Sequence, residues 1–504
     1  MSKRELFIKN TLYNTSFKLV NQMIALFILP LFVKNLGAEL YGIWVISGVI
    51  IGYLGILDLG FSQGVMKYIS EALNKKDQAQ FSQVFSSSTA LFLLIGAFIG
   101  LIIFVFNERL LSLFAIAASD YETARSLLKI SAFFAPLFWT ARITSITFQG
   151  ALHFKAHSIL SGVQSLGRTM SMLYMVYSGY DIVVIAIVCN TVQLILWLPS
   201  IIVLKRMFPR LLLSPKNVKI NVIRRMIPFS LGVFYASLTS MLGLQLDNLI
   251  IGAAISMSAV TAYAVASKLF NIGYQYMGLL SGVLQPTSYH AYANNDKLVI
   301  EKIMERGTSY MSMLYSSVGY MGIIISPIFI GLWMGAAFLQ YAIWSQAFML
   351  LIIITSGTGL PINLVFNSGR TKPPNVVKTI GIIVNLTVSI SLVKYFGIGG
   401  PIIGTLAASL IGLLTYPYFC KLLDFNWQKY LFIKLKITII NIPATVFFFW
   451  VQNQIEPTWA NLILILATMS VVFFGTFYFL IFTHEMKEDL SILLAQIKPR
   501  AVGS

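Results

Sequence analysis

Apolar runs of about 20 residues recur along almost the whole of this 504-residue chain, separated by short polar breaks. A helix needs about 20 apolar residues to cross a hydrocarbon core about 30 Å thick, and a helix satisfies its own backbone there. Charged residues make up only 11% of the chain, against roughly 25% in an average soluble protein. The pattern therefore predicts an all-α integral membrane protein and excludes an ordinary soluble enzyme.

We predict fourteen transmembrane helices from the apolar runs. They lie near residues 12–33, 42–64, 81–106, 124–148, 158–178, 182–204, 227–254, 259–285, 308–333, 341–366, 376–395, 401–420, 430–451 and 459–482. The first run follows Lys3, Arg4 and Lys9 and has no small-residue cleavage site, so it is expected to stay as a helix rather than be removed as a signal peptide.

A basic segment in the middle of the chain suggests how the spans are grouped. It divides the first twelve spans into six and six, which is typical of an internal duplication in a secondary transporter. We therefore predict an N-terminal lobe at 1–204 with spans 1–6, a basic cytoplasmic linker at 205–226, and a C-terminal lobe at 227–420 with spans 7–12. Spans 13 and 14 follow at 421–482, and a cytoplasmic tail occupies 483–504.

The distribution of basic residues predicts the orientation. Of the 36 Lys and Arg residues, 27 fall in the tails and the even-numbered loops with their flanks, and five fall in the opposite loops. Positive charge marks the cytoplasmic side of a membrane protein. Both termini are therefore predicted to be cytoplasmic, and the excess of positive charge is explained by topology rather than by nucleic-acid binding.

Several sequence motifs resemble a known family. They are LGAELYG at 36–42, LDLGF at 57–61, QLDNLIIG at 245–252 and VTAYA at 260–264. With fourteen predicted spans and no large loop, the chain resembles the polysaccharide transporter branch of the multidrug/oligosaccharidyl-lipid/polysaccharide exporter superfamily. Members of that branch include Wzx-type O-antigen flippases.

The resemblance implies a function and a location. Similar proteins move undecaprenyl-pyrophosphate-linked oligosaccharide, of the O-antigen or capsule type, to the outer leaflet of the bacterial cytoplasmic membrane by alternating access. Coupling to a H+ or Na+ gradient is expected. Membrane lipids and polysaccharide assembly proteins are the other expected partners. No cofactor, metal or enzymatic activity is expected, since the two cysteines form no metal-ligand motif and no Walker A lysine motif is present.

Four basic residues within predicted spans are the candidate substrate ligands. A charge at the bilayer centre costs about 2.5 to 3.5 kcal/mol on insertion scales, so such residues usually face an interior cavity and are functional. Arg168 and Arg142 are assigned to the pyrophosphate because a guanidinium presents a planar fork to phosphate oxygens. Lys268 is a further candidate. Lys18 lies only about six residues into its span, where an interfacial snorkelling role is equally compatible with the sequence.

Two acidic residues are the candidates for ion coupling, Asp58 and Asp247. Intramembrane carboxylates in coupled transporters bind Na+ or exchange protons. The structural alternative is that Asp247 caps a helix or forms a salt bridge, and that Asp58 pairs with Lys67. Likewise, His153 and His157 have a spacing that suits a metal on a helix, yet two ligands without a third favour a solvated surface.

Two other transport functions stay open at this point. A peptidoglycan lipid-precursor flippase shares the fourteen spans and a cationic cavity. A cation-coupled multidrug exporter of the same superfamily would be expected to have acidic cavity residues and twelve spans. A membrane-embedded glycosyltransferase would need catalytic groups in a sizeable outer loop, and the longest predicted outer loop, near 107–123, has no recognisable catalytic arrangement.

Overall fold

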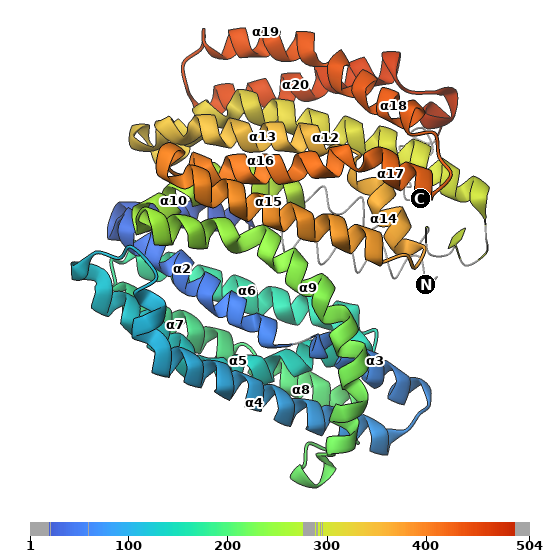
Figure 1. The fold of residues 1–504 in the computed structure, drawn as a ribbon. Helices are drawn as coiled ribbons and strands as arrows, with labels where there is room; N and C mark the ends of the chain where they lie inside the picture. The colour runs from blue at the N-terminus through green and yellow to red at the C-terminus, as the bar shows by residue number, and fades with distance from the viewer. Residues whose placement is uncertain are drawn as a thin grey trace, which may run out of the picture. The chain divides into compact units, whose positions relative to one another are not determined.

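The computed structural model describes residue 20 and residues 22–58, 60–275, 288, 291–292, 294 and 296–488. Within these ranges every regular element is a helix, which confirms the predicted all-α class (Figure 1). The chain divides into two units, one of Met1–Ala262 with Val393–Ile398 and the other of Tyr263–Leu392 with Gly399–Ser504. The predicted lobes, linker and tail remain predictions.

The first unit contains α2 to α9 and most of α10. The elements are α2 (Ala38–Leu54), η1 (Gly55–Asp58), α3 (Phe61–Asn74), α4 (Gln78–Leu111), η2 (Ala118–Asp120), α5 (Tyr121–Gly150), α6 (Phe154–Tyr177), α7 (Ile182–Ile195), α8 (Leu198–Met207), η3 (Pro215–Asn217), α9 (Ile220–Ala254) and α10 (Met257–Ala266).

The second unit contains most of the remaining helices, and α15 ends in the stretch assigned to the first unit. The elements are α12 (Lys297–Met334), η4 (Ala336–Tyr341), α13 (Ala342–Thr355), α14 (Gly359–Asn367), α15 (Lys372–Phe396), α16 (Gly399–Leu414), α17 (Tyr416–Leu422), α18 (Trp427–Ile440), α19 (Ile442–Gln452) and α20 (Trp459–Leu480). In this unit the 38-residue α12 contacts α13, α18, α19 and α20.

Eight helical segments among the described residues are long and apolar enough to cross a membrane, and three shorter apolar helices accompany them. Helices α5, α6 and α9 have 30, 24 and 35 residues but are not among the eight, although all exceed the length that a span requires. Polar side chains dilute their apolar character. The structure is that of a multi-pass membrane protein, and the number fourteen remains a prediction.

Several predicted continuous spans are broken into two helices. The span at 182–204 divides into α7 and α8 at Leu196, and the span at 430–451 divides into α18 and α19 at Asn441. In both cases a proline follows within the first turn of the second helix, at Pro199 and Pro443. Proline lacks the backbone N–H and fits best where a helix begins, which explains why the break falls just before it.

Helices α4 and α5 pack closely because two glycines of α4 face the backbone of α5. A Cβ atom at Gly96 would lie 2.7 Å from the Cα of Pro136, and one at Gly100 would lie 2.5 Å from the carbonyl oxygen of Ala132. Small residues at a helix interface allow backbones to approach in a membrane, where packing rather than the hydrophobic effect drives association. This pair forms one wall of the first unit.

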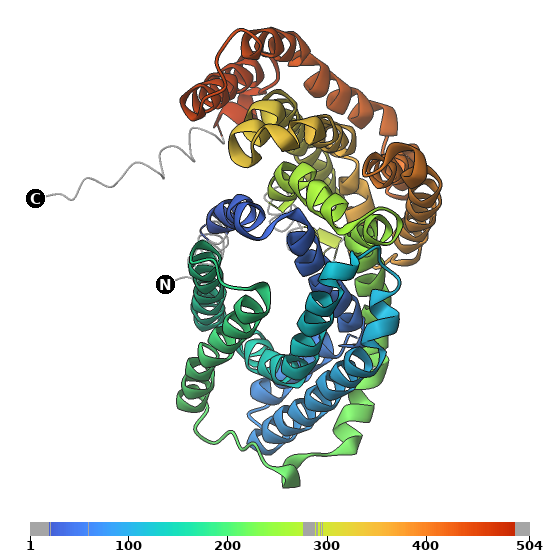
Figure 2. The ribbon, with the colours of Figure 1, turned by 90° about the vertical axis from the view of Figure 1, so that its left-hand side faces the viewer.

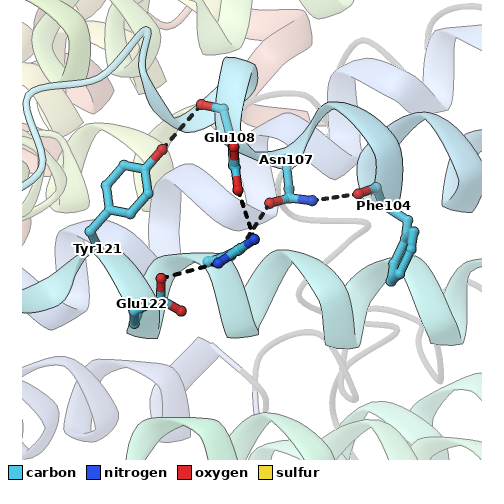
Figure 3. Close-up of polar contacts among 6 residues, drawn as sticks. Phe104, Asn107, Glu108, Tyr121 and Glu122 are labelled. Atoms are coloured by element: carbon cyan, nitrogen blue, oxygen red, sulfur yellow. Dashed lines mark hydrogen bonds and ion pairs between the residues drawn. The ribbon is translucent and has the colours of Figure 1, made fainter.

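A polar network connects the far end of α4 to the start of α5. The Arg125 guanidinium pairs with Glu108 at 2.7 Å and Glu122 at 3.2 Å, and it donates to the Asn107 side chain at 3.3 Å. Figure 3 shows these groups gathered around one guanidinium, with the Tyr121 hydroxyl donating to the Glu108 carbonyl. Two of the three carboxylates in the predicted outer loop, Glu108 and Glu122, therefore take part in a structural network that holds two helix ends together.

A second network connects α3 to α9 at the opposite end of the unit. Glu71 accepts hydrogen bonds from Lys75 at 2.7 Å and from Arg225 at 3.1 Å. The Lys75 hydrogen bond, with the positive charges of Lys75 and Arg225, lowers the pKa of Glu71 below its usual range. The first unit thus has a polar network that connects its helices at each end.

Candidate functional site in the first unit

A cavity of about 640 Å³ lies within the first unit. Its walls come from α2, η1, α5, α6 and α7 and from the residues around the start of α8. Figure 2 views these helices nearly along their axes, with the blue to green helices arranged in a ring. The volume lies within the range of about 300 to 1,000 Å³ that is usual for small-molecule sites.

The polar lining of the cavity follows from helical periodicity. On α6 the lining residues His157, Ser161, Gln164 and Arg168 are spaced by four, three and four positions. Residues three and four apart lie on one face of a helix, so these side chains form a single stripe. Asn190 and Gln193 on α7 follow the same spacing and also line the cavity. This stripe explains why α6 is less apolar than the helices that face lipid.

Arg168 lies deep in this stripe. It is the fifteenth residue of α6, roughly 21 Å along the helix axis from Phe154. Its side chain is exposed at the cavity lining. No carboxylate of the described residues lies within ion-pair distance of its guanidinium. A positive charge facing a cavity without an internal counter-ion provides a site for an external anion.

Arg142 projects into the same cavity from α5. Its guanidinium lies over the Trp139 ring at 4.7 Å and 3.7 Å from a carboxylate oxygen of Asp58, with 47% of the side chain exposed. The structure therefore brings together the two arginines that the sequence assigns to one anionic group. Their role in binding that group remains a proposal.

The two carboxylate oxygens of Asp58 make different contacts. Its Oδ1 accepts a hydrogen bond from the backbone N–H of Ser62 at 3.1 Å, in the first turn of α3, and its Oδ2 faces Arg142. The suggested pairing of Asp58 with Lys67 is wrong. The Lys67 ammonium lies instead over the Phe229 ring, 4.4 Å from its centroid. An N-terminal helix position and a guanidinium both attract a carboxylate, which explains this placement.

His157 is a cavity residue that sequence reasoning placed on a solvated surface. Its Nδ1 lies 3.1 Å from the Ser145 hydroxyl of α5, and the ring lines the cavity. His153 instead packs against the ring of Phe208. The spacing of polar residues on α6 could have indicated this position, since His157 is the first residue of that stripe. The predicted span begins at residue 158, so the sequence prediction leaves His157 in the preceding turn.

Three tryptophans complete the lining, Trp44, Trp139 and Trp197. Trp197 donates from its indole nitrogen to the Thr144 hydroxyl at 3.0 Å, and Gln164 donates to the Ser200 hydroxyl at 2.9 Å. These hydrogen bonds orient an aromatic face and an amide within the cavity. Aromatic faces and amides are the groups that pack against sugar rings and bond to their hydroxyls.

The other predicted site residues lie elsewhere. Asp247 is buried in α9, with 8% exposed, and lies outside the cavity lining. Lys268 lies in the second unit, just beyond α10, and is partly buried. Lys18 lies outside the described residues. The cavity lining therefore includes Arg168 and Arg142. Asp58 lies outside the lining and contacts it through Arg142, and neither Asp247 nor Lys268 is part of it.

The residues that match a known family extend across the whole cavity. A family model described as polysaccharide biosynthesis protein matches residues 7–290, which is more than half of the chain. The chain belongs to this family. The resemblance drawn from the LGAELYG and LDLGF segments is thereby confirmed.

A curated relative and several solved structures resemble this family member. It is 25% identical over 158 residues to a putative O-antigen transporter of Shigella flexneri, an alignment that spans 31% of this chain and only 37% of that protein. The lipid II flippase MurJ in an inward closed conformation aligns with a TM-score of 0.72 at 16% identity, covering 92% of this chain and 98% of MurJ.

A multidrug transporter shares the fold as well. An inward-facing MATE family transporter of the MOP superfamily aligns with a TM-score of 0.69 at 13% identity, covering 80% of this chain and 94% of that one. Identities this low show a common fold and nothing about substrate. This chain therefore has the fold of the MOP transporters.

The contact between Asp58 and Arg142 leads to a prediction about anion binding. Replacing Asp58 by Asn removes the internal counter-ion, so inorganic pyrophosphate is expected to bind about two to five times more tightly, because exposed ion pairs are worth about 0 to 1 kcal/mol. Quenching of tryptophan fluorescence in detergent-purified protein measures this, since Trp139 lies against Arg142. Asp120→Asn, at a partly buried carboxylate outside the cavity lining, is the matched control, and equal affinities in both variants would contradict the prediction.

Proposed function

We propose that this polysaccharide biosynthesis protein is a flippase that moves undecaprenyl-pyrophosphate-linked oligosaccharide from the cytoplasmic to the periplasmic leaflet of the bacterial inner membrane. The observation that carries the proposal is the cavity with Arg168 and Arg142 on its walls. Two guanidinium groups match the oxygens of a pyrophosphate, and one of them has no internal counter-ion among the described residues.

The cavity lining supports a saccharide as the remainder of the substrate. Tryptophan faces and side-chain amides, such as Trp197, Gln164 and Asn190, offer packing surfaces and hydrogen bonds for sugar hydroxyls. Placed within one bundle, these groups would shelter a polar head group while its lipid tail stays in the bilayer. Repeat units of the O-antigen or capsule type fit this chemistry, and assembly proteins of the same polysaccharide are the expected partners.

Transport by alternating access completes the proposal. The predicted lobes at 1–204 and 227–420 would rock about the substrate, driven by a H+ or Na+ gradient and with both termini in the cytoplasm. Asp58 is the first candidate for coupling because it faces Arg142, which lines the cavity. Asp247 remains a second candidate, and Lys268 and Lys18 remain candidate ligands in other parts of the transport path.

A peptidoglycan lipid-precursor flippase is the second candidate function, because its substrate carries the same pyrophosphate and a saccharide. The likeness in fold to lipid II flippase MurJ over 92% of the chain favours keeping it. A cation-coupled multidrug exporter is disfavoured by the cavity charge, since two arginines line the cavity and, among the described residues, only Arg142 is paired with a carboxylate. Like charges across a binding site exclude a cationic ligand.

Reconstituted vesicles test the proposal directly. The native protein is incorporated into vesicles with a fluorescent undecaprenyl-pyrophosphate oligosaccharide, and the label in the outer leaflet is reduced chemically to reveal how much lipid has crossed. Crossing is expected under a H+ or Na+ gradient, and protein-free vesicles supply the background. Lipid II and a cationic dye are run in parallel. Transport of lipid II alone would favour the second candidate, and transport of the dye alone would favour the exporter. If none of these three compounds crosses, the proposal is overturned.

A further inference from the structure

The segment that joins α8 to α9 is fixed against the first turns of α4. The Leu212 carbonyl accepts from the Ser86 hydroxyl at 3.0 Å, and the backbone N–H of Lys219 donates to the Ser87 hydroxyl at 2.9 Å. The N–H groups of Leu212 and Ser214 donate to Ser82 and Ser86, both at 3.3 Å. These three serines are at most 5% exposed. We call residues 208–219 the strap, and its backbone is held in place.

The fixed strap directs apolar side chains outward. Leu212 is 62% exposed and Leu213 is 63% exposed, and Ile220 at the start of α9 is 61% exposed. Figures 1 and 2 show this green segment at the end of the unit where α4 begins. Adjacent leucines held outward by hydrogen-bonded backbone mark a surface that contacts something apolar.

The charged residues around these leucines are all positive. Residues 182–246 contain seven Lys and Arg residues and no Asp or Glu. Arg225 is paired with Glu71, whereas Arg210, Lys216 and Lys219 are exposed on the strap. Apolar side chains between exposed cations are the composition of a surface that binds anionic lipid.

The depth of the strap agrees with a headgroup position. An uninterrupted apolar stretch of α4 runs from Ala90 to Phe106. At about 1.5 Å per residue, Ser87 lies roughly 4.5 Å and Ser82 roughly 12 Å before that stretch begins. The headgroup region adds about 5 to 8 Å to each side of the hydrocarbon core. Ser87 therefore lies at headgroup depth and Ser82 about 4 Å beyond it, which places the strap at the outer boundary of the headgroup region.

We infer that the strap is an anionic-lipid binding surface of the leaflet on the side where α4 begins. Leu212 and Leu213 enter the leaflet between headgroups, while Arg210, Lys216 and Lys219 bind the phosphates of phosphatidylglycerol or a lipid of similar charge. Because the strap joins α8 to α9, this lipid contact anchors the connection between the two predicted lobes. The inference does not depend on the substrate proposed above.

A nitroxide label at Leu213→Cys tests the inference in nanodiscs. The full-length protein is placed in phosphatidylcholine alone or with added phosphatidylglycerol, and collision of the label with oxygen is compared with collision with a water-soluble nickel chelate. The native protein, whose Cys189 and Cys420 are both buried, supplies the labelling background. We expect the label to favour oxygen when phosphatidylglycerol is present. Replacing Arg210 and Lys216 by Gln is expected to abolish the dependence on phosphatidylglycerol.

A label at Gln78→Cys, the exposed first residue of α4, is the matched control and is expected to favour the nickel chelate in both lipids. A Leu213 label that favours the nickel chelate with phosphatidylglycerol would overturn the inference. Equal depth in both lipids would also overturn it, because no anionic lipid would then be recognised. Exclusion of both reagents would show that protein, such as a second copy of the chain, covers the strap.

Discussion

Arg168→Ala is expected to reduce the initial rate of lipid-linked oligosaccharide crossing by about 30-fold or more at low substrate concentration. In the proposed substrate complex the pyrophosphate covers Arg168 within the cavity. Truncating one partner of such an enclosed charge pair costs about 2 to 5 kcal/mol, and tenfold corresponds to about 1.4 kcal/mol. Arg168 lines the cavity with no carboxylate partner among the described residues, so its charge is available to the pyrophosphate. Leaflet distribution in vesicles at matched protein incorporation measures the rate.

Two variants separate this role from a general effect of charge. Arg168→Lys keeps the charge but loses the planar fork, so an intermediate rate is expected. Arg109→Gln removes an equal charge from the exposed end of α4, where the side chain lies over Phe106, and the native rate is expected. A native rate in Arg168→Ala, with the native protein active, would remove this arginine from the proposed site while leaving the flippase function to be carried by other residues.

Gly42→Ala is expected to destabilise the first unit by about 1 to 3 kcal/mol, the usual cost of overpacking. A Cβ atom at Gly42 would collide with the backbone carbonyl of Met257, lying 2.5 Å from its carbonyl carbon. Two hydrogen bonds flank this contact. The Thr261 hydroxyl donates to the Ala38 carbonyl at 2.5 Å, and the Ser258 N–H donates to Glu39 at 2.7 Å. Separating α2 from α10 would weaken both.

The melting temperature of the detergent-purified protein measures this effect. Gly48→Ala is the matched control on the same helix, because a Cβ atom there meets nothing within 4 Å. Since alanine is the better helix former by about 1 kcal/mol, the control is expected to melt at or slightly above the native temperature. Equal melting temperatures for the two variants would show that α2 and α10 separate without cost.

Part of the candidate site could be predicted from single residues. Arg168 and Arg142 were identified because a charge in the middle of an apolar run is costly and needs a reason. Asp58 was identified in the same way, but its partner was not, because Arg142 lies 84 positions further along the chain. His157 was missed because its position in the cavity depends on where α6 begins. Helix boundaries are the feature that is predicted least precisely from a sequence.

Lys434 shows the same limit in the second unit. It is one of the 27 basic residues that the sequence prediction places in or beside cytoplasmic loops. In the structure it is 5% exposed in α18, and its ammonium donates to the Ile354 carbonyl at 2.7 Å. That carbonyl belongs to the last turn of α13, where backbone acceptors lack helical partners. A buried ammonium at a helix C-terminus is favourable because it meets the negative end of the helix dipole. Charge counting along the chain cannot detect such a partner.

The fold class, the membrane location and the family could be inferred from the amino-acid sequence, because long apolar runs and short motifs are properties of contiguous residues. The packing of the helices was needed to show that α6 and α7 turn their polar stripes toward one cavity that Arg142 of α5 also lines, that Asp58 faces Arg142, and that the strap holds Leu212 and Leu213 outward. The physical reason is that hydrophobicity acts residue by residue, whereas ion pairs, cavities and exposed faces depend on which distant helices pack together.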